Sequence, residues 1–139
     1  MFEAHYRVYC DGGCSQNGSQ QARGYASYLL ESRAGQRQMV RLNDLPGVAT
    51  NNEAEYVALV SALVDLRARI ERAGQSPRDY SVAVHTDSQL VVGQLTQGWQ
   101  VKAANLRPLV DEAQTLLHAF GRCNLVKAPR DEIVRVLGH

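Results

Sequence analysis

Two apolar segments of strand length each end on an aspartate. Residues 6–10 lead into Asp11, and residues 80–86 lead into Asp87. A third acid, Glu55, stands where a loop turns into a long helical pattern. A carboxylate beside a buried strand is costly unless a positive charge compensates it, and oxygen ligands of this kind suit hard divalent cations such as Mg²⁺. The chain is therefore expected to fold so that these acids share one metal site.

The spacing of apolar and turn residues predicts three strands, a long helix, a strand, two helices, a strand and a short final helix. The strands are expected at residues 6–10, 24–31, 36–42, 80–86 and 123–128, and the helices at about 51–72, 88–95, 106–120 and 131–137. Asn51 or Asn52 is expected to cap the long helix.

This order of elements predicts an α/β fold. The first three strands suit an antiparallel meander, and a right-handed strand–helix–strand connection makes residues 80–86 a parallel neighbour of residues 6–10. Asp11 and Asp87 then emerge at one edge, and Glu55 can point to the same place. We expect one domain over residues 1–139, with a five-stranded mixed sheet, three strands antiparallel and two parallel, flanked by helices.

The composition restricts the possible partners and compartments. The formal net charge is +1, so a polyanion must be held by a local patch rather than by the whole molecule. No apolar run approaches the roughly 20 residues of a membrane helix, and the N-terminus does not resemble a secretory signal. Cys10, Cys14 and Cys123 form no even framework, which favours free thiols. We expect a cytoplasmic monomer that does not enter membranes.

Short motifs surround the three acids and continue along the chain. They are Asp11-Gly12-Gly13-Cys14 with Asn17, Thr50-Asn51-Asn52 with Glu55, Thr86-Asp87-Ser88-Gln89, Gly98-Trp99 with Lys102, and Val126 with Pro129-Arg130-Asp131. In these motifs and their order the chain resembles type 1 ribonuclease H, the enzyme family that cuts the RNA strand of RNA–DNA hybrids. The resemblance covers residues 6 to about 130.

The resemblance implies an RNase H-like fold in which Asp11, Glu55 and Asp87 are catalytic and hold two Mg²⁺ or Mn²⁺ ions. In this family one ion activates the attacking water and the other stabilises the leaving 3′-oxygen, which gives 5′-phosphate and 3′-hydroxyl ends. The implied partner is an RNA–DNA hybrid. The residues expected to bind it are Asn17, Thr50, Asn51, Asn52, Gln89, Trp99 and Lys102.

Structural alternatives remain open for several of these residues. Asn17, Asn52 and Gln89 also suit turns or caps, and Thr50 suits a helix cap as well as a phosphate contact. Trp99 is equally suited to packing in the core. Asp11 is also a common turn residue before glycine, and Asp87 also suits a helix cap.

The C-terminal segment departs from the family pattern. Ile133 stands where the family has an asparagine, and Leu137 stands where it has a fourth acid. Asp131 is the candidate to replace that acid as a metal ligand, with Glu132 and His139 as the other local candidates. Weaker metal binding is the expected consequence.

Two further functional hypotheses follow from these observations. Loss of the fourth acid is compatible with a module that binds hybrids and cleaves them weakly or not at all. A resolvase or integrase core has a similar acid triad, but Thr50-Asn51-Asn52 and the loop of Asn17 favour a ribonuclease H.

Overall fold

The computed structural model describes residues 3–138. Its strands and helices are β1 (Tyr6–Ser15), β2 (Arg23–Ser32), β3 (Arg37–Leu45), α1 (Asn51–Arg72), β4 (Ser81–Thr86), α2 (Gln89–Thr96), α3 (Arg107–Leu117), β5 (Arg122–Lys127) and α4 (Arg130–Leu137). Short 3₁₀ turns lie at Pro77–Asp79 and Ala104–Leu106. The predicted order of elements is confirmed, including the short final helix.

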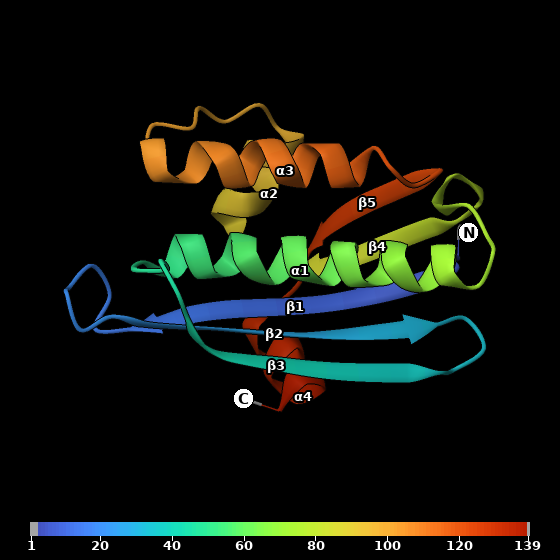
Figure 1. The fold of residues 1–139 in the computed structure, drawn as a ribbon, viewed down its shortest axis with the longest axis horizontal. Coiled ribbons are helices and arrows are strands. Elements are labelled where there is room, and N and C mark those ends of the chain that lie inside the picture. Colours follow the sequence, from blue (N-terminus) through green and yellow to red (C-terminus); the bar gives the residue numbers. More distant parts are fainter. Residues whose placement is uncertain (1–2, 139) are drawn as a thin grey trace.

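The sheet has the strand order β3-β2-β1-β4-β5 (Figure 1). β1 is antiparallel to β2, and β2 is antiparallel to β3. β4 is parallel to both of its neighbours, β1 and β5. The predicted five-stranded mixed sheet is therefore confirmed, and the parallel β1–β4 pair brings the segments that precede Asp11 and Asp87 side by side.

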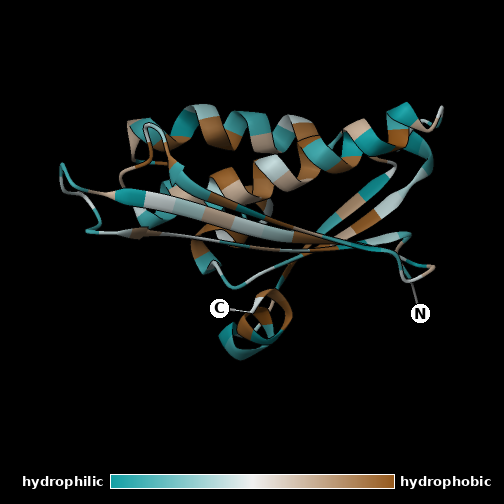
Figure 2. Ribbon diagram, turned by 60° about the horizontal axis from the view of Figure 1, so that its bottom comes forward, coloured by the Kyte–Doolittle hydropathy of each residue, from teal (hydrophilic) through white to brown (hydrophobic). Residues whose placement is uncertain are grey.

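The helices form layers on both faces of the sheet. Figure 2 shows α4 on one side of the sheet and the longer helices on the other. The larger core lies between the sheet and α1, and its fully buried side chains include Val8, Tyr56, Leu59, Leu63, Leu66, Val82 and Val84. A smaller core lies under α4 and contains Tyr9, Leu29, Ala128, Ile133 and Leu137.

The two positions of the family pattern that are apolar in this chain lie in the smaller core. Ile133 and Leu137 are fully buried, and they attach α4 to β1 and β2. The main-chain carbonyl of Leu137 accepts a hydrogen bond of 2.7 Å from Arg41 of β3, and Gly138 ends the helix with a left-handed backbone. Burial of these two side chains explains why α4 stays on the sheet although it has only 8 residues.

Several predicted boundaries are wrong, and α3 ends at Leu117 instead of Phe120. β1 does not end at Cys10, because residues up to Ser15 continue to pair with β2, and Asp11 lies opposite Ser27 within the strand. β3 extends to Leu45, past a register shift in its pairing with β2. The cap of α1 is Thr50, not Asn51 or Asn52, because the Thr50 hydroxyl accepts the hydrogen bond from the Glu53 amide.

Candidate active site

Asp11 and Asp87 meet at the edge of the sheet where β1 leaves β4. The parallel pairing of these strands ends at Tyr9 and His85, so each aspartate follows the last paired residue by two positions. The side chain of Asp11 is 2% exposed and that of Asp87 is 16% exposed. The same nitrogen, Nη1 of Arg130, lies 3.0 Å from Asp11 Oδ1 and 3.2 Å from Asp87 Oδ2. The two carboxylates therefore share one counter-charge in this structure.

Glu55 reaches this place because α1 begins directly over β1. A Cβ atom at Gly12 would overlap the main-chain carbonyl of Ala54, so only glycine allows the first turn of α1 to come so close to the strand. The Thr50 cap and the hydrogen bonds from the Ala49 amide and the Thr50 hydroxyl to the Glu53 carboxylate fix where that turn begins.

The electrostatics of Glu55 show that the three acids interact. Burial raises the pKa of Glu55 to about 7, and the charges of Asp87 and Asp11 also raise it. A hydrogen bond with Ser88 and the charge of Arg130 act in the opposite direction. Asp11 and Asp87 lie together at one Arg130 nitrogen. That Glu55 joins them in one metal site, and the catalytic roles of all three acids, stay predictions.

Carboxylate oxygens are suitable ligands for a hard cation, but the side chains are not arranged as a complete metal site. Oδ1 of Asp87 is buried and has no hydrogen-bond partner among residues 3–138. Such an oxygen is the type of ligand that Mg²⁺ takes. No group of three His, Cys, Asp or Glu side chains in the described part of the chain lies together so that it could hold a metal ion. The donor atoms therefore suit a divalent ion, while the positive charge beside Asp11 and Asp87 in this structure is that of Arg130.

The contact of Arg130 with both aspartates was not predicted from the sequence. Arg130 stood only within the motif Pro129-Arg130-Asp131, whereas the structure makes it the first residue of α4 and the counter-charge of both aspartates. The feature that could have indicated Arg130 is the requirement for a positive charge near buried acids. Asp131, the expected replacement ligand, is exposed in the first turn of the same helix. His139 lies outside the described residues.

Asn17 and Asn51 join the loop after β1 to the start of α1. The Asn17 side-chain oxygen accepts a hydrogen bond of 2.8 Å from the Asn51 amide nitrogen. The Asn51 side-chain oxygen in turn accepts one of 2.7 Å from the Cys14 amide nitrogen. Both side chains are exposed, so their NH₂ groups can still face a ligand. These two predicted substrate residues therefore have a structural role as well, and Asn52 is exposed beside them.

The remaining predicted substrate residues lie along α2 and the loop that follows it. Gln89 is exposed at the start of α2, and with Val92, Gln97 and Lys127 it lines a hollow of about 260 Å³. Trp99 is 41% exposed, and its ring lies against Gly93 so closely that a Cβ there would overlap it. Lys102 is exposed in the same loop. Trp99 is thus packed on α2 rather than enclosed in the core.

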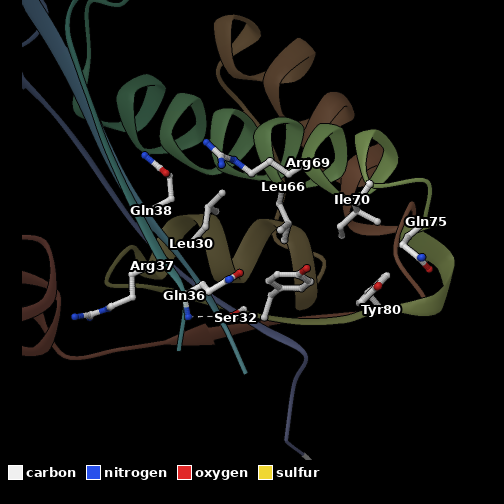
Figure 3. A pocket seen from close by; sticks show the side chains of 12 residues that line it. Leu30, Ser32, Gln36, Arg37, Gln38, Leu66, Arg69, Ile70, Gln75 and Tyr80 are labelled. Atoms are coloured by element: carbon white, nitrogen blue, oxygen red, sulfur yellow. Dashed lines mark hydrogen bonds between the residues drawn. The ribbon is translucent and has the colours of Figure 1, made fainter. Parts of the chain in front are cut away.

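A hollow of about 420 Å³ lies elsewhere, between the β2–β3 hairpin and the end of α1 (Figure 3). Tyr6, the first residue of β1, belongs to its lining. Leu66 and Ile70 of α1 point into it, and its two arginines are paired with Glu31 and Asp65. Its cationic side chains are therefore already compensated, and the acids of the candidate site lie apart from it.

None of the helices within residues 3–138 has the length and apolar character needed to cross a membrane.

Comparison with known proteins gives a consistent result. A family model described as RNase H matches residues 3–127, which includes Asp11, Glu55 and Asp87 and stops before α4. Ribonuclease HI of Halobacterium salinarum is 38% identical over 87 residues, which are 63% of this chain and 40% of that protein. The bifunctional protein Rv2228c of Mycobacterium tuberculosis is 39% identical over 84 residues, which are 60% of this chain and 21% of that protein. The chain thus spans less than half the length of these two relatives.

Solved structures show the same fold. The crystal structure of RNase H1 from Halobacterium salinarum has a TM-score of 0.70 and 27% identity, and the alignment covers 94% of this chain and 89% of that chain. LC11-RNase H1, solved in complex with an RNA/DNA hybrid, has a TM-score of 0.73 and 24% identity over 94% of this chain and 89% of that chain.

Proposed function

The chain belongs to the RNase H family, and from that premise we propose that it is a metal-dependent endoribonuclease that hydrolyses the RNA strand of RNA–DNA hybrids. The observation that carries the proposal is that Asp11 and Asp87 both contact one nitrogen of Arg130. The charges of both aspartates also raise the pKa of Glu55. Three acids concentrated at one sheet edge repel one another, so a bound cation lowers their energy.

Asp11, Glu55 and Asp87 would hold the ions, and Asp11 is the more buried of the two aspartates. Two bound Mg²⁺ or Mn²⁺ ions would supply an activated water and stabilise the leaving oxygen. Glu55 and Asp87 would serve as further ligands and would help to orient the water beside the scissile phosphate. Hydrolysis in this arrangement leaves 5′-phosphate and 3′-hydroxyl ends.

The exposed amides around the acids are suited to hold the hybrid. Three of them lie where the loop after β1 contacts the start of α1, namely Asn17, Asn51 and Asn52. Gln89 lies at the start of α2. Their NH₂ groups can donate to base edges and to ribose 2′-hydroxyls, which distinguish RNA from DNA. Thr50, Trp99 and Lys102 are assigned to the phosphate backbone, where contacts set affinity and make it depend on salt.

One observation favours the second candidate, a module that binds hybrids and cleaves them weakly. Leu137, at the position of the fourth family acid, is fully buried in the smaller core and supplies no ligand. Fewer ligands weaken divalent-ion binding, because affinity follows the number and charge of the ligands. The two candidates differ in rate rather than in the surface that they present to the hybrid.

The deciding experiment is incubation of the protein with an end-labelled RNA–DNA hybrid in Mg²⁺ and, separately, in Mn²⁺. RNA–RNA and DNA–DNA duplexes of the same sequence are the controls. We expect cleavage of the RNA strand of the hybrid alone, at internal positions, with products that carry 5′-phosphates. Binding of the hybrid without cleavage in either metal would favour the second candidate. Cleavage of all three duplexes, or no binding of any, would refute both.

A further inference from the structure

We propose that Arg130 is a built-in counter-cation that holds the acid site together in the metal-free protein and is displaced when a divalent ion enters. This inference rests on the proposed function, since it concerns the same acids. Arg130 Nη1 lies within ion-pair distance of both Asp11 and Asp87, at the position where a shared ion would neutralise them. A single arginine thus supplies the positive charge that two poorly exposed carboxylates require.

The contact geometry makes Arg130 displaceable. Both ion pairs use the same guanidinium nitrogen, so this one NH₂ group is divided between two carboxylates. The Arg130 side chain is 52% exposed, and it can move into water without opening the core. An ion of charge +2 attracts the same acids more strongly than the guanidinium does.

The oxygen that Arg130 leaves unused is also available to an ion. Oδ1 of Asp87 is buried and has no hydrogen-bond partner within the described residues, while Oδ2 of the same carboxylate contacts Arg130. A divalent ion coordinates several carboxylate oxygens at once. Replacement of Arg130 by an ion therefore compensates an atom that the arginine does not reach.

Release of Arg130 does not require α4 to leave the sheet. The helix is held by the buried side chains of Ile133 and Leu137 and by the hydrogen bond from Arg41 to the Leu137 carbonyl. Arg130 lies at the opposite end of the helix, in its first position. The movement that we infer is therefore a change of side-chain conformation.

If Arg130 competes with the ion, its removal should change the stability of the metal-free protein and the affinity for the ion in opposite directions. Removal of the arginine should destabilise the metal-free protein and, at the same time, tighten metal binding. If Arg130 only oriented the acids for the ion, its removal would weaken metal binding instead. A purely structural role would lower stability and leave the affinity for the ion unchanged.

The test uses Arg130→Ala and Arg130→Gln, with Arg135→Ala as the matched control. Arg135 is exposed in the last turn of the same helix, so its loss changes the net charge equally. Calorimetric titration with Mg²⁺, without nucleic acid, should give a dissociation constant about tenfold lower for both Arg130 variants, equivalent to the loss of one modest ion-pair competitor. Their melting temperatures should be lower than wild type without Mg²⁺ and should rise more steeply with added Mg²⁺. Arg135→Ala should match wild type.

Equal or weaker Mg²⁺ affinity in the Arg130 variants would overturn the inference and leave the proposed function standing. Absence of Mg²⁺ and Mn²⁺ binding in wild type and variants alike would overturn both. A measurement on the wild-type protein covers the case in which the variants do not fold. The side-chain Nε–Hε signal of Arg130 in NMR spectra should move on Mg²⁺ titration toward the position of an arginine in water, and an unchanged signal at saturating Mg²⁺ would contradict displacement.

Discussion

Gly12 of β1 lies directly under the main-chain carbonyl of Ala54, so that a side chain at position 12 would overlap the first turn of α1. This close approach places Glu55 over the strand that carries Asp11. The geometry of the acid site therefore depends on the absence of a Cβ atom at Gly12.

Gly12→Ala should lower stability and activity together. The new methyl group meets rigid main chain, which must shift, and overpacking of this kind costs about 1–3 kcal/mol. Urea unfolding and hybrid cleavage would measure the two effects. Gly13→Ala is the comparison, because the three atoms nearest to its Cβ would belong to the far end of the Tyr25 side chain and not to main chain. Equal losses for both substitutions would contradict this account.

Asp11→Asn should remove hybrid cleavage and leave the fold intact. The amide has nearly the same shape but lacks the charge that both the guanidinium and a divalent ion require. Cleavage should fall below detection, and circular dichroism should be unchanged. Asp44→Asn is the matched control, since Asp44 is 79% exposed and its distance to Arg23 is 3.9 Å. Full cleavage by Asp11→Asn would exclude this residue from catalysis.

Thr50→Ala should destabilise the protein by about 1 kcal/mol, because it removes the side-chain acceptor for the Glu53 amide. Thr50→Ser should retain most of the stability, since serine caps equally well. Hybrid affinity, measured at one fixed salt concentration, separates the cap from a phosphate contact. If Thr50 also contacts a phosphate, Thr50→Ala weakens hybrid binding under conditions in which the variant is fully folded, and an unchanged affinity leaves only the cap.

Gly93→Ala should change the environment of Trp99, whose ring occupies the space next to Gly93. Trp99 is the single tryptophan of the chain, so intrinsic fluorescence reports it alone. Displacement of the ring into water should shift its emission to longer wavelength. In the wild-type protein, a contact with the hybrid should change the Trp99 emission on titration. Emission that is unaffected by Gly93→Ala would show that the ring is not held there.

The thiol of Cys123 should make stability fall at alkaline pH. Burial raises the pKa of Cys123 from 9.0 to about 12. Between these values the unfolded chain loses the proton and the folded chain keeps it, so the unfolded state is favoured increasingly as the pH rises through that window. Cys123→Val cannot titrate. The free energy of unfolding should therefore decrease more for wild type than for Cys123→Val between pH 8 and pH 10, values chosen about one unit on either side of 9. Parallel decreases would contradict the shift.

Local patterns were sufficient to predict most of the fold. Alternation of apolar residues in the strands and the helical spacing of small and apolar residues after Asn52 are short-range features, and they fixed the order of elements. The parallel neighbours followed from the handedness of strand–helix–strand connections. The boundaries were less accurate, because pairing with β2 extends β1 through Gly12 and Gly13, residues with no strand preference of their own.

The candidate site, like the fold, was predicted from the sequence only in part. The sequence by itself determined that Asp11 and Asp87 follow two strand segments that pair in parallel, since both patterns are local. The place of Glu55 in the same metal site stays a prediction. Only the tertiary structure decided that Arg130 supplies their counter-charge, that Asn17 and Asn51 join the first loop to α1, and that Leu137 serves the core under α4. Contacts of this type join residues that are distant along the chain. They depend on the docking of whole elements, and a periodic pattern within one segment carries no information about what packs against it.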